Sequence, residues 1–326
     1  MEKDLSKYSI RTDLALDLID NIPSKVVDDI TITDIDVDDN LSKKINKKIG
    51  KYITIEFKDI TDFNNSKKIK QIFSKYLKKL LIGDNFLIVG LGNNLVTPDS
   101  LGPSVIDHII VTNHIYELDS LENGFKRVSA IKTSVMGSTG IETINIIKGV
   151  INYLKPSQVI VIDSLASSSL ERLNKTIQIT DTGINPGSGV YNNRKEISYE
   201  TLGVPVLAIG VPTVLDAATI VSDTINYMCK KYSYDKKNIN NPVNRLIVNK
   251  NYLEENIYDI EDRKKLLGLI GNLNDEEIKR LAFEVLNPIG YNLMVTPKEI
   301  DFLIKKLGEV IGNGINRSIH KKVKEI

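Results

Sequence analysis

The chain has 326 residues, and its 43 Lys and Arg residues almost balance 42 Asp and Glu residues, giving a net charge of +1. This length predicts about two domains, or one large α/β domain with attachments. The near-neutral charge argues against a partner held by global charge, such as nucleic acid or an anionic membrane. The single cysteine, Cys229, excludes an internal disulfide framework and a Cys-rich zinc site, and three histidines leave little for a His-based metal site.

The N-terminal residues are polar and partly acidic, without the apolar centre of a secretory signal. The best candidate for a membrane span, residues 203–212, is short and interrupted by Gly and Pro. We therefore expect a soluble, cytoplasmic protein without a membrane partner.

Two segments near the N-terminus, 29–37 and 52–57, carry an apolar residue at every second position. This period is typical of half-buried strands, which we expect to be antiparallel. The Lys-rich run between them, residues 43–51, could form a basic patch, but acidic residues surround it, and we expect a solvated loop.

Continuous apolar segments alternate with helical patterns in the middle of the chain. The predicted strands are 86–90, 128–135, 159–162, 176–180 and 204–209, and the predicted helices are 100–116, 141–154 and 214–231. Strands that are apolar throughout are typical of a parallel sheet covered on both faces. We expect an α/β fold with a mostly parallel sheet flanked by helices, N-terminal β additions and a C-terminal helical segment.

The composition changes again after this core. Residues 233–262 are rich in Asn, Lys and Asp with little periodicity, as in a linker or insertion. Helical spacing returns in 263–326, with helix starts at Asp275 and at Thr296, which precedes Pro297.

Two carboxylates follow strands of the predicted core. Asp99 lies in the loop after the first strand, Asp163 directly follows residues 159–162, and Asp216 enters a helix nearby. Ligands of open α/β sheets bind outside the carboxyl ends of the strands, so Asp99 and Asp163 are expected at one edge. Asp99 could simply cap the next helix, whereas a carboxylate that ends a buried strand needs partners. Two carboxyl groups close together would share one proton and could activate water against a peptide carbonyl.

Other motifs compete with this pair. The glycines at 90, 92 and 102 do not have the spacing of a dinucleotide or phosphate loop. Asp181 begins an Asp-Thr-Gly tripeptide found in pepsin-like proteases, but one copy in an α/β chain is better explained as a turn. The spacing of the three histidines does not place them together as metal ligands, and no Ser-His-Asp arrangement is evident. Cys229 is expected to lie on a helix and to pack against its neighbours.

Several long motifs, in order, resemble the germination protease family of spore-forming Firmicutes. They are the segments 8–15, 90–103, 135–143, 186–203, 209–216 and 292–299. The resemblance covers the chain to about residue 316 and is weak over residues 20–80 and 233–262. One departure is Thr133-Ser134, where the family usually has Pro-Gly.

The resemblance implies an endopeptidase that degrades small acid-soluble spore proteins during germination, in the spore core. It also implies a homotetramer and a zymogen that removes its own N-terminus, with cleavage between Asp13 and Leu14. The implied fold is similar to that of hydrogenase-maturation endopeptidases, and the family's two proposed catalytic aspartates match Asp99 and Asp163. The implied organisation is a propeptide 1–13, a β-containing extension 14–80, a catalytic core 81–232, a variable linker 233–262, and a helical segment 263–326 packed on the core.

The favoured roles make Asp163 the general base and Asp99 the acid, although a coupled pair permits the reverse. Backbone amides of residues 136–140, at a helix start, could stabilise an oxyanion. The supporting residues expected around the pair are Asn93, Gly137, Gly140, Glu142 and Asp216. No cofactor, metal or direct nucleic-acid partner is expected. Two alternatives stay open, a metal-dependent endopeptidase related to hydrogenase-maturation proteases and a non-catalytic binding protein.

Overall fold

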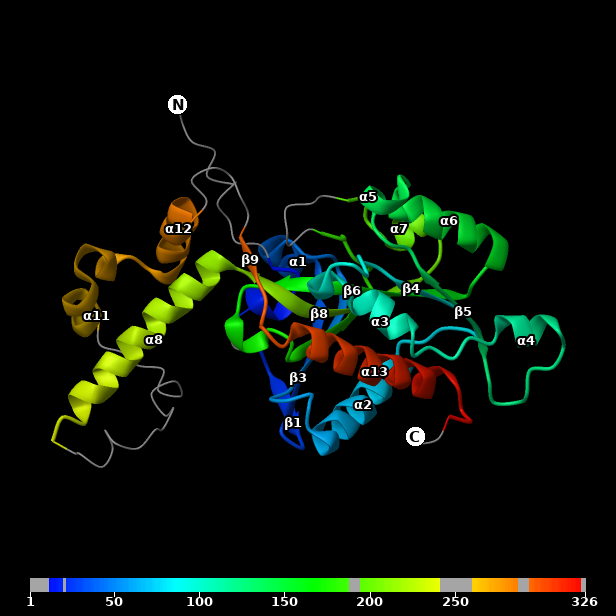
Figure 1. Cartoon of the computed structure of the whole chain (residues 1–326), viewed down its shortest axis with the longest axis horizontal. Coiled ribbons are helices and arrows are strands. Elements are labelled where there is room, and N and C mark those ends of the chain that lie inside the picture. The colour runs from blue at the N-terminus through cyan, green and yellow to red at the C-terminus, as the bar shows by residue number, and fades with distance from the viewer. Residues whose placement is uncertain (1–11, 20–21, 188–193, 241–259, 287–292, 324–326) are drawn as a thin grey trace. The chain divides into compact units, whose positions relative to one another are not determined.

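The computed structural model describes residues 12–19, 22–187, 194–240, 260–286 and 293–323 (Figure 1). The chain divides into two units, a larger one within residues 11–214 and 296–326 and a smaller one within residues 215–295. The propeptide expected at 1–13 therefore lies outside the described residues except for Thr12 and Asp13.

Nine strands of the described residues form one sheet. Their order is β1-β2-β3-β7-β8-β6-β4-β5, and β9 pairs with β8. The strands are β1 (Ser24–Val27), β2 (Ile30–Val37), β3 (Gly50–Glu56), β4 (Asn85–Gly90), β5 (Arg127–Lys132), β6 (Gln158–Ser167), β7 (Thr176–Thr180), β8 (Val206–Asp216) and β9 (Met294–Val295).

The prediction of a mostly parallel sheet is wrong, because the sheet is mixed. Strand β4 pairs in parallel with β5 and β6, whereas β1–β2, β2–β3, β3–β7, β7–β8 and β8–β9 are antiparallel. The predicted antiparallel pairing of the two N-terminal strands is confirmed, and β3 continues the sheet through β7. Strand β7 is buried along its whole length, so its sequence looks like that of a parallel strand.

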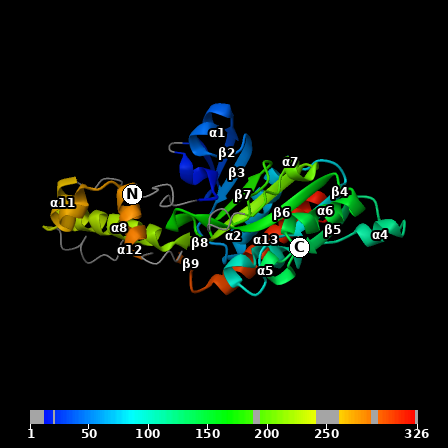
Figure 2. The same cartoon turned by 90° about the horizontal axis from the view of Figure 1, so that it is seen from above.

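Helices cover both faces of the sheet in the larger unit (Figure 1). One core cluster joins the sheet to α2 (Phe63–Lys78), α3 (Leu101–Ile106) and α13 (Ile300–Ile319). A second cluster, on the opposite face, joins it to α6 (Thr143–Leu154) and α7 (Tyr199–Leu202). A third, smaller cluster joins α1 (Asp39–Ile45) and the N-terminal segment to β2 and β3, which lie beside α1 in Figure 2.

Several predicted boundaries differ from the structure. The Lys-rich loop begins inside α1, whose cap Asp38 accepts a hydrogen bond from the Leu41 amide at 2.8 Å. The helix expected over 100–116 is two short helices, α3 and α4 (Asn113–Glu117). Strand β6 continues past residue 162 to Ser167, and β8 continues past residue 209 to Asp216, so the helix expected from residue 214 begins at Ala217. The remaining short elements of this unit are α5 (Met136–Thr139) and the 3-10 turns η2 (Ala15–Leu18), η3 (Thr97–Asp99) and η4 (Leu170–Arg172).

The smaller unit is mainly helical. Helix α8 (Ala217–Lys237) packs against α11 (Ile260–Leu267) and α12 (Asp275–Leu286), and η6 (Gly268–Asn272) connects the latter two. Cys229 lies on α8 and is buried, as expected of a packing residue. Among the described residues, no helix is both long and apolar enough to cross a membrane.

Candidate active site

Asp163 lies within β6 and points to the sheet face covered by α6. Side chains alternate along a strand, and Ile160 and Ile162 belong to the opposite core cluster. The Asp163 side chain is buried, with 5% of the residue surface exposed, and its Oδ1 accepts a hydrogen bond from the Ser164 amide at 2.9 Å. Burial raises the pKa of Asp163 well above its usual value, and the charges of Asp99 and Asp13 raise it further. The fold therefore favours the protonated form of this carboxyl group.

Asp99 ends η3, directly after the loop that follows β4. Its Oδ2 accepts a hydrogen bond from the Asn93 amide at 2.8 Å, and the N-cap residue of α3 is Ser100, whose side chain makes no capping hydrogen bond. Asp99 is therefore not the helix cap that its sequence position allowed. Burial raises the pKa of Asp99, while the Asn93 amide and the charge of Arg194 lower it.

The glycines of this loop let its backbone fold tightly around Asp99. Gly92 has a φ of 101°, and a Cβ atom there would lie 1.9 Å from the Asp99 carbonyl oxygen. A Cβ on Gly102 would lie 2.3 Å from the carbonyl oxygen of Leu91. Close packing of backbone on backbone thus accounts for these glycines.

The two aspartates lie within electrostatic reach of each other. The charge of Asp99 is the second largest cause, after burial, of the raised pKa of Asp163, and the charge of Arg194 acts on both groups. A pair of partly desolvated carboxyl groups beside one cation holds a single proton over a wide pH range. Such a pair can offer a base to water and an acid to a leaving amine.

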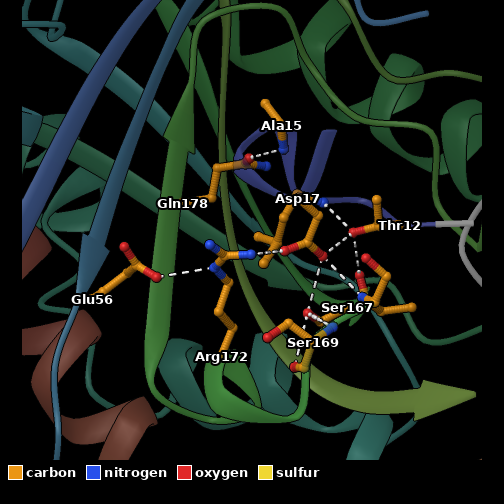
Figure 3. Close-up of polar contacts among 11 residues, drawn as sticks. Thr12, Ala15, Asp17, Glu56, Ser167, Ser169, Arg172 and Gln178 are labelled. Carbon is orange, nitrogen blue, oxygen red and sulfur yellow. Dashed lines mark hydrogen bonds and ion pairs between the residues drawn. The ribbon is translucent and has the colours of Figure 1, made fainter. Parts of the chain in front are cut away.

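Asp17 fastens the N-terminal segment 12–18 to the end of β6 and to Arg172 (Figure 3). The Asp17 carboxylate accepts hydrogen bonds from Thr12 Oγ1 at 2.5 Å, Ser167 Oγ at 3.0 Å and the Ser168 amide at 2.9 Å. Arg172 Nη1 lies 2.6 Å from its other oxygen and Arg172 Nε donates to Glu56 at 3.0 Å. We call these residues, Thr12, Asp17, Glu56, Ser167, Ser168 and Arg172, the Asp17 clamp.

The expected processing bond, Asp13–Leu14, lies immediately before the turn that carries Asp17. Leu14 is fully buried, and the Asp13 amide donates to the Ala166 carbonyl of β6 at 3.0 Å. The Ala166 amide in turn donates to Asp13 Oδ2 at 2.9 Å. Asp13 is thus held against β6 at Ala166, three residues after Asp163.

The other expected site residues lie on several different elements of the structure. Gly137 lies in α5, and Gly140 ends that helix with a φ of 68°. The amides of Ser138, Thr139 and Gly140 donate to backbone carbonyls, so these three are already engaged.

Two carboxylates of the expected set contact backbone amides. Glu142 Oε1 accepts from the Lys195 amide at 3.3 Å. Asp216 caps α8 by accepting from the Ala218 amide at 2.7 Å, and burial raises its pKa.

Periodicity and spacing gave no signal for the Asp17 clamp or for the effect of Arg194, which stands in a polar loop of the family segment 186–203. Asp181, expected in a turn, accepts a hydrogen bond from the Lys51 amide at 2.8 Å. Within the described ranges, no group of three or more His, Cys, Asp or Glu side chains is arranged to hold a metal ion.

Comparisons with known proteins agree along the chain. A family model described as germination protease matches residues 12–326. Relatives named germination protease include one from Bacillus cereus (strain AH187), 45% identical over 98% of this chain and 96% of the relative. Another, from Bacillus mycoides (strain KBAB4), is 44% identical over the same shares.

Among solved structures, a [NiFe] hydrogenase maturation protease, HycI from Thermococcus kodakarensis KOD1, shows a weak similarity. It is 19% identical, with a TM-score of 0.29, over 42% of this chain and 80% of that chain.

Proposed function

Because the chain belongs to the germination protease family, and is therefore a protease, we propose that it hydrolyses peptide bonds with water activated by Asp99 and Asp163. The observation that carries this proposal is the electrostatic coupling of the two carboxyl groups, both of which have raised pKa values. The nearby Arg194 limits the charge that accumulates when one of them ionises.

The environments favour one division of roles. Asp163 is more deeply buried and its pKa is raised well above the usual value, so it holds the shared proton and donates it to the leaving amine. Asp99 accepts a backbone hydrogen bond and is nearer to water, so it is the ionised base. This division reverses the one favoured from the sequence, and proton sharing permits both.

The substrates that we propose are the small acid-soluble proteins of the spore, degraded during germination. We also propose that the protein forms a homotetramer and acts in the spore core. It would be made as a zymogen that cuts its own chain between Asp13 and Leu14, which removes residues 1–13. Support comes from the hydrogen bonds that hold Asp13 to Ala166 of β6, three residues after Asp163.

The test replaces each carboxyl group by its isosteric amide. Asp99→Asn and Asp163→Asn should each lower the rate of spore-protein cleavage by about 10²–10⁴-fold, the usual contribution of a general acid or base. Asp107→Asn is the matched control, because Asp107 is an exposed aspartate that pairs with Lys132. Near wild-type cleavage by either amide variant, with folding confirmed by circular dichroism, would end the paired-aspartate proposal.

Chelation distinguishes the metal-dependent alternative. Cleavage by the full chain should be unchanged after dialysis against a strong chelator if the two carboxyl groups act on water directly. Loss of activity that a divalent metal restores would favour the alternative.

A further inference from the structure

The carbonyl group of Asp13 receives hydrogen bonds from two side chains. Lys47 Nζ lies 3.1 Å from the Asp13 carbonyl oxygen, and Gln178 Nε2 lies 3.3 Å from it. The other end of the Gln178 amide accepts from the Ala15 amide at 2.8 Å, which Figure 3 shows. Gln178 therefore contacts the chain on both sides of the Asp13–Leu14 bond, and its donor faces the Asp13 carbonyl.

Gln178 lies on the same face of the sheet as Asp163. Ile177 and Ile179, the neighbours of Gln178 on β7, belong to the core cluster that also contains Ile160 and Ile162. Because side chains alternate along strands, Gln178 and Asp163 both point to the other face. The Asp13 carboxylate accepts from the Ala166 amide of β6, three residues after Asp163, and its charge contributes to the raised pKa of Asp163, after burial and Asp99.

Lys47 brings its charge to a partly buried position. Burial lowers the pKa of Lys47, and the carboxylates of Asp13 and Asp17, which face it from the N-terminal segment, oppose that change. Lys47 Nζ also donates to the Thr12 carbonyl at 3.0 Å, which fixes its place over the chain. A fixed cation away from bulk water stabilises developing negative charge more than the same cation in water.

We propose that Lys47 and Gln178 form the oxyanion site for self-cleavage at Asp13–Leu14. This inference rests on the proposed function, because it assumes that the aspartate pair cuts that bond. The oxygen of water would bond to the Asp13 carbonyl carbon while one water proton passes to the ionised aspartate. The carbonyl oxygen becomes negative and is held by Lys47 and Gln178. The C–N bond then breaks as the protonated aspartate gives its proton to the Leu14 nitrogen.

The test follows release of residues 1–13 from the full-length chain by intact mass, over a series of pH values. Lys47→Met removes the charge and should slow release by about 10²–10³-fold, the usual effect of removing one oxyanion donor. Gln178→Glu keeps the acceptor for the Ala15 amide but loses the donor, and should also slow release. Lys48→Met is the matched control, because Lys48 pairs with Glu196 and Glu200 instead, and should cut at the wild-type rate.

Charge rescue separates catalysis from anchoring. Lys47→Arg keeps the positive charge and should restore much of the release rate that Lys47→Met loses. Amide exchange over residues 12–18 provides the structural readout for each variant. Slow release by Lys47→Met with unchanged exchange supports the inference, and slow release with lost protection shows that Lys47 only anchors the segment, which overturns it.

Two further outcomes distinguish this inference from the function on which it rests. If the wild type releases residues 1–13 and Lys47→Met does so equally fast, the oxyanion site is wrong and the proposed self-processing stands. If the wild type releases nothing between about pH 5 and pH 8, where a raised carboxyl pKa and a lysine permit the reaction, both proposals fail.

Discussion

Removing the Asp17 carboxylate should free the N-terminal segment without unfolding the sheet. Only 1% of the Asp17 side chain is exposed, and it accepts bonds from three neutral donors and from Arg172. Breaking a buried ion pair costs about 3–5 kcal/mol. The Arg172 side chain is 27% exposed and keeps its ion pair with Glu56 in the variant. The lower end of that range therefore applies, and Asp17→Ala should destabilise the seated segment by about 3 kcal/mol. This corresponds to about a 150-fold rise in the equilibrium constant for local opening.

Hydrogen–deuterium exchange of the Ala15 amide measures this opening, because that amide donates to Gln178 only while the segment is seated. The measurement uses an Asp163→Asn background, so that the segment stays attached. Asp17→Asn keeps the shape and loses the charge, and should have an intermediate effect of about 1–2 kcal/mol. Asp39→Ala is the control, because the exposed pair that Asp39 forms with Lys43 is worth only about 0.3–0.5 kcal/mol. Exchange of Ala15 in Asp17→Ala within about threefold of the background, less than 1 kcal/mol, would refute the reasoning.

Three other predictions concern the site and its loops. Asp163→Asn should leave the fold at least as stable as the wild type at pH 7. Because the pKa of Asp163 is raised in the folded state, the wild type loses stability as the pH rises from the ordinary carboxyl pKa to the raised value, and the amide variant does not. Denaturant titrations should show this difference shrinking toward pH 4, and a variant that is less stable at pH 7 would contradict it. Gly92→Ala should displace Asp99 and abolish cleavage, whereas Gly203→Ala, with a positive φ but nothing within 4 Å of the added Cβ, should cost only about 1–2 kcal/mol and keep activity. Ser134 has a φ of 58°, a left-handed conformation that costs a serine more than a glycine. Ser134→Gly should therefore raise the free energy of unfolding by about 0.5 kcal/mol, which is the relieved backbone strain minus the larger conformational entropy that glycine loses on folding. A lowered melting temperature would count against this.

Local patterns predicted the strands better than their arrangement. The alternation in β2 and β3 indicated an antiparallel pair, and the apolar runs located β4, β6 and β7. The direction of β7 could not be predicted, because a strand buried on both faces has the same composition in parallel and antiparallel sheets. Strand β6 was expected to end before Asp163, since a carboxylate in a strand interior is unusual, and its neighbours Asp99 and Arg194 come from remote segments.

Asp99 and Asp163 became candidates because strand ends and family motifs coincide there. Both carboxyl groups have raised pKa values, and their catalytic role stays a prediction. Lys47, Gln178 and Asp17 were not identified, because each is an ordinary polar residue in its own segment. Their relation depends on contacts between separate segments, 34 residues apart for Lys47 and Asp13 and 165 residues apart for Gln178 and Asp13, and no periodicity encodes such contacts.

The Asp17 clamp has a consequence for the direction of the proposed cut. Thr12 lies before the Asp13–Leu14 bond, and Asp17, Ser167 and Arg172 lie after it. Hydrolysis would turn the contact of Thr12 with Asp17 from one within a continuous chain into one between two molecules, which dilution opposes. The shorter piece would diffuse away while Asp17 stays bound to the body of the enzyme. Resynthesis of the bond would then require capture of a scarce peptide from solution, so maturation would proceed once and in one direction.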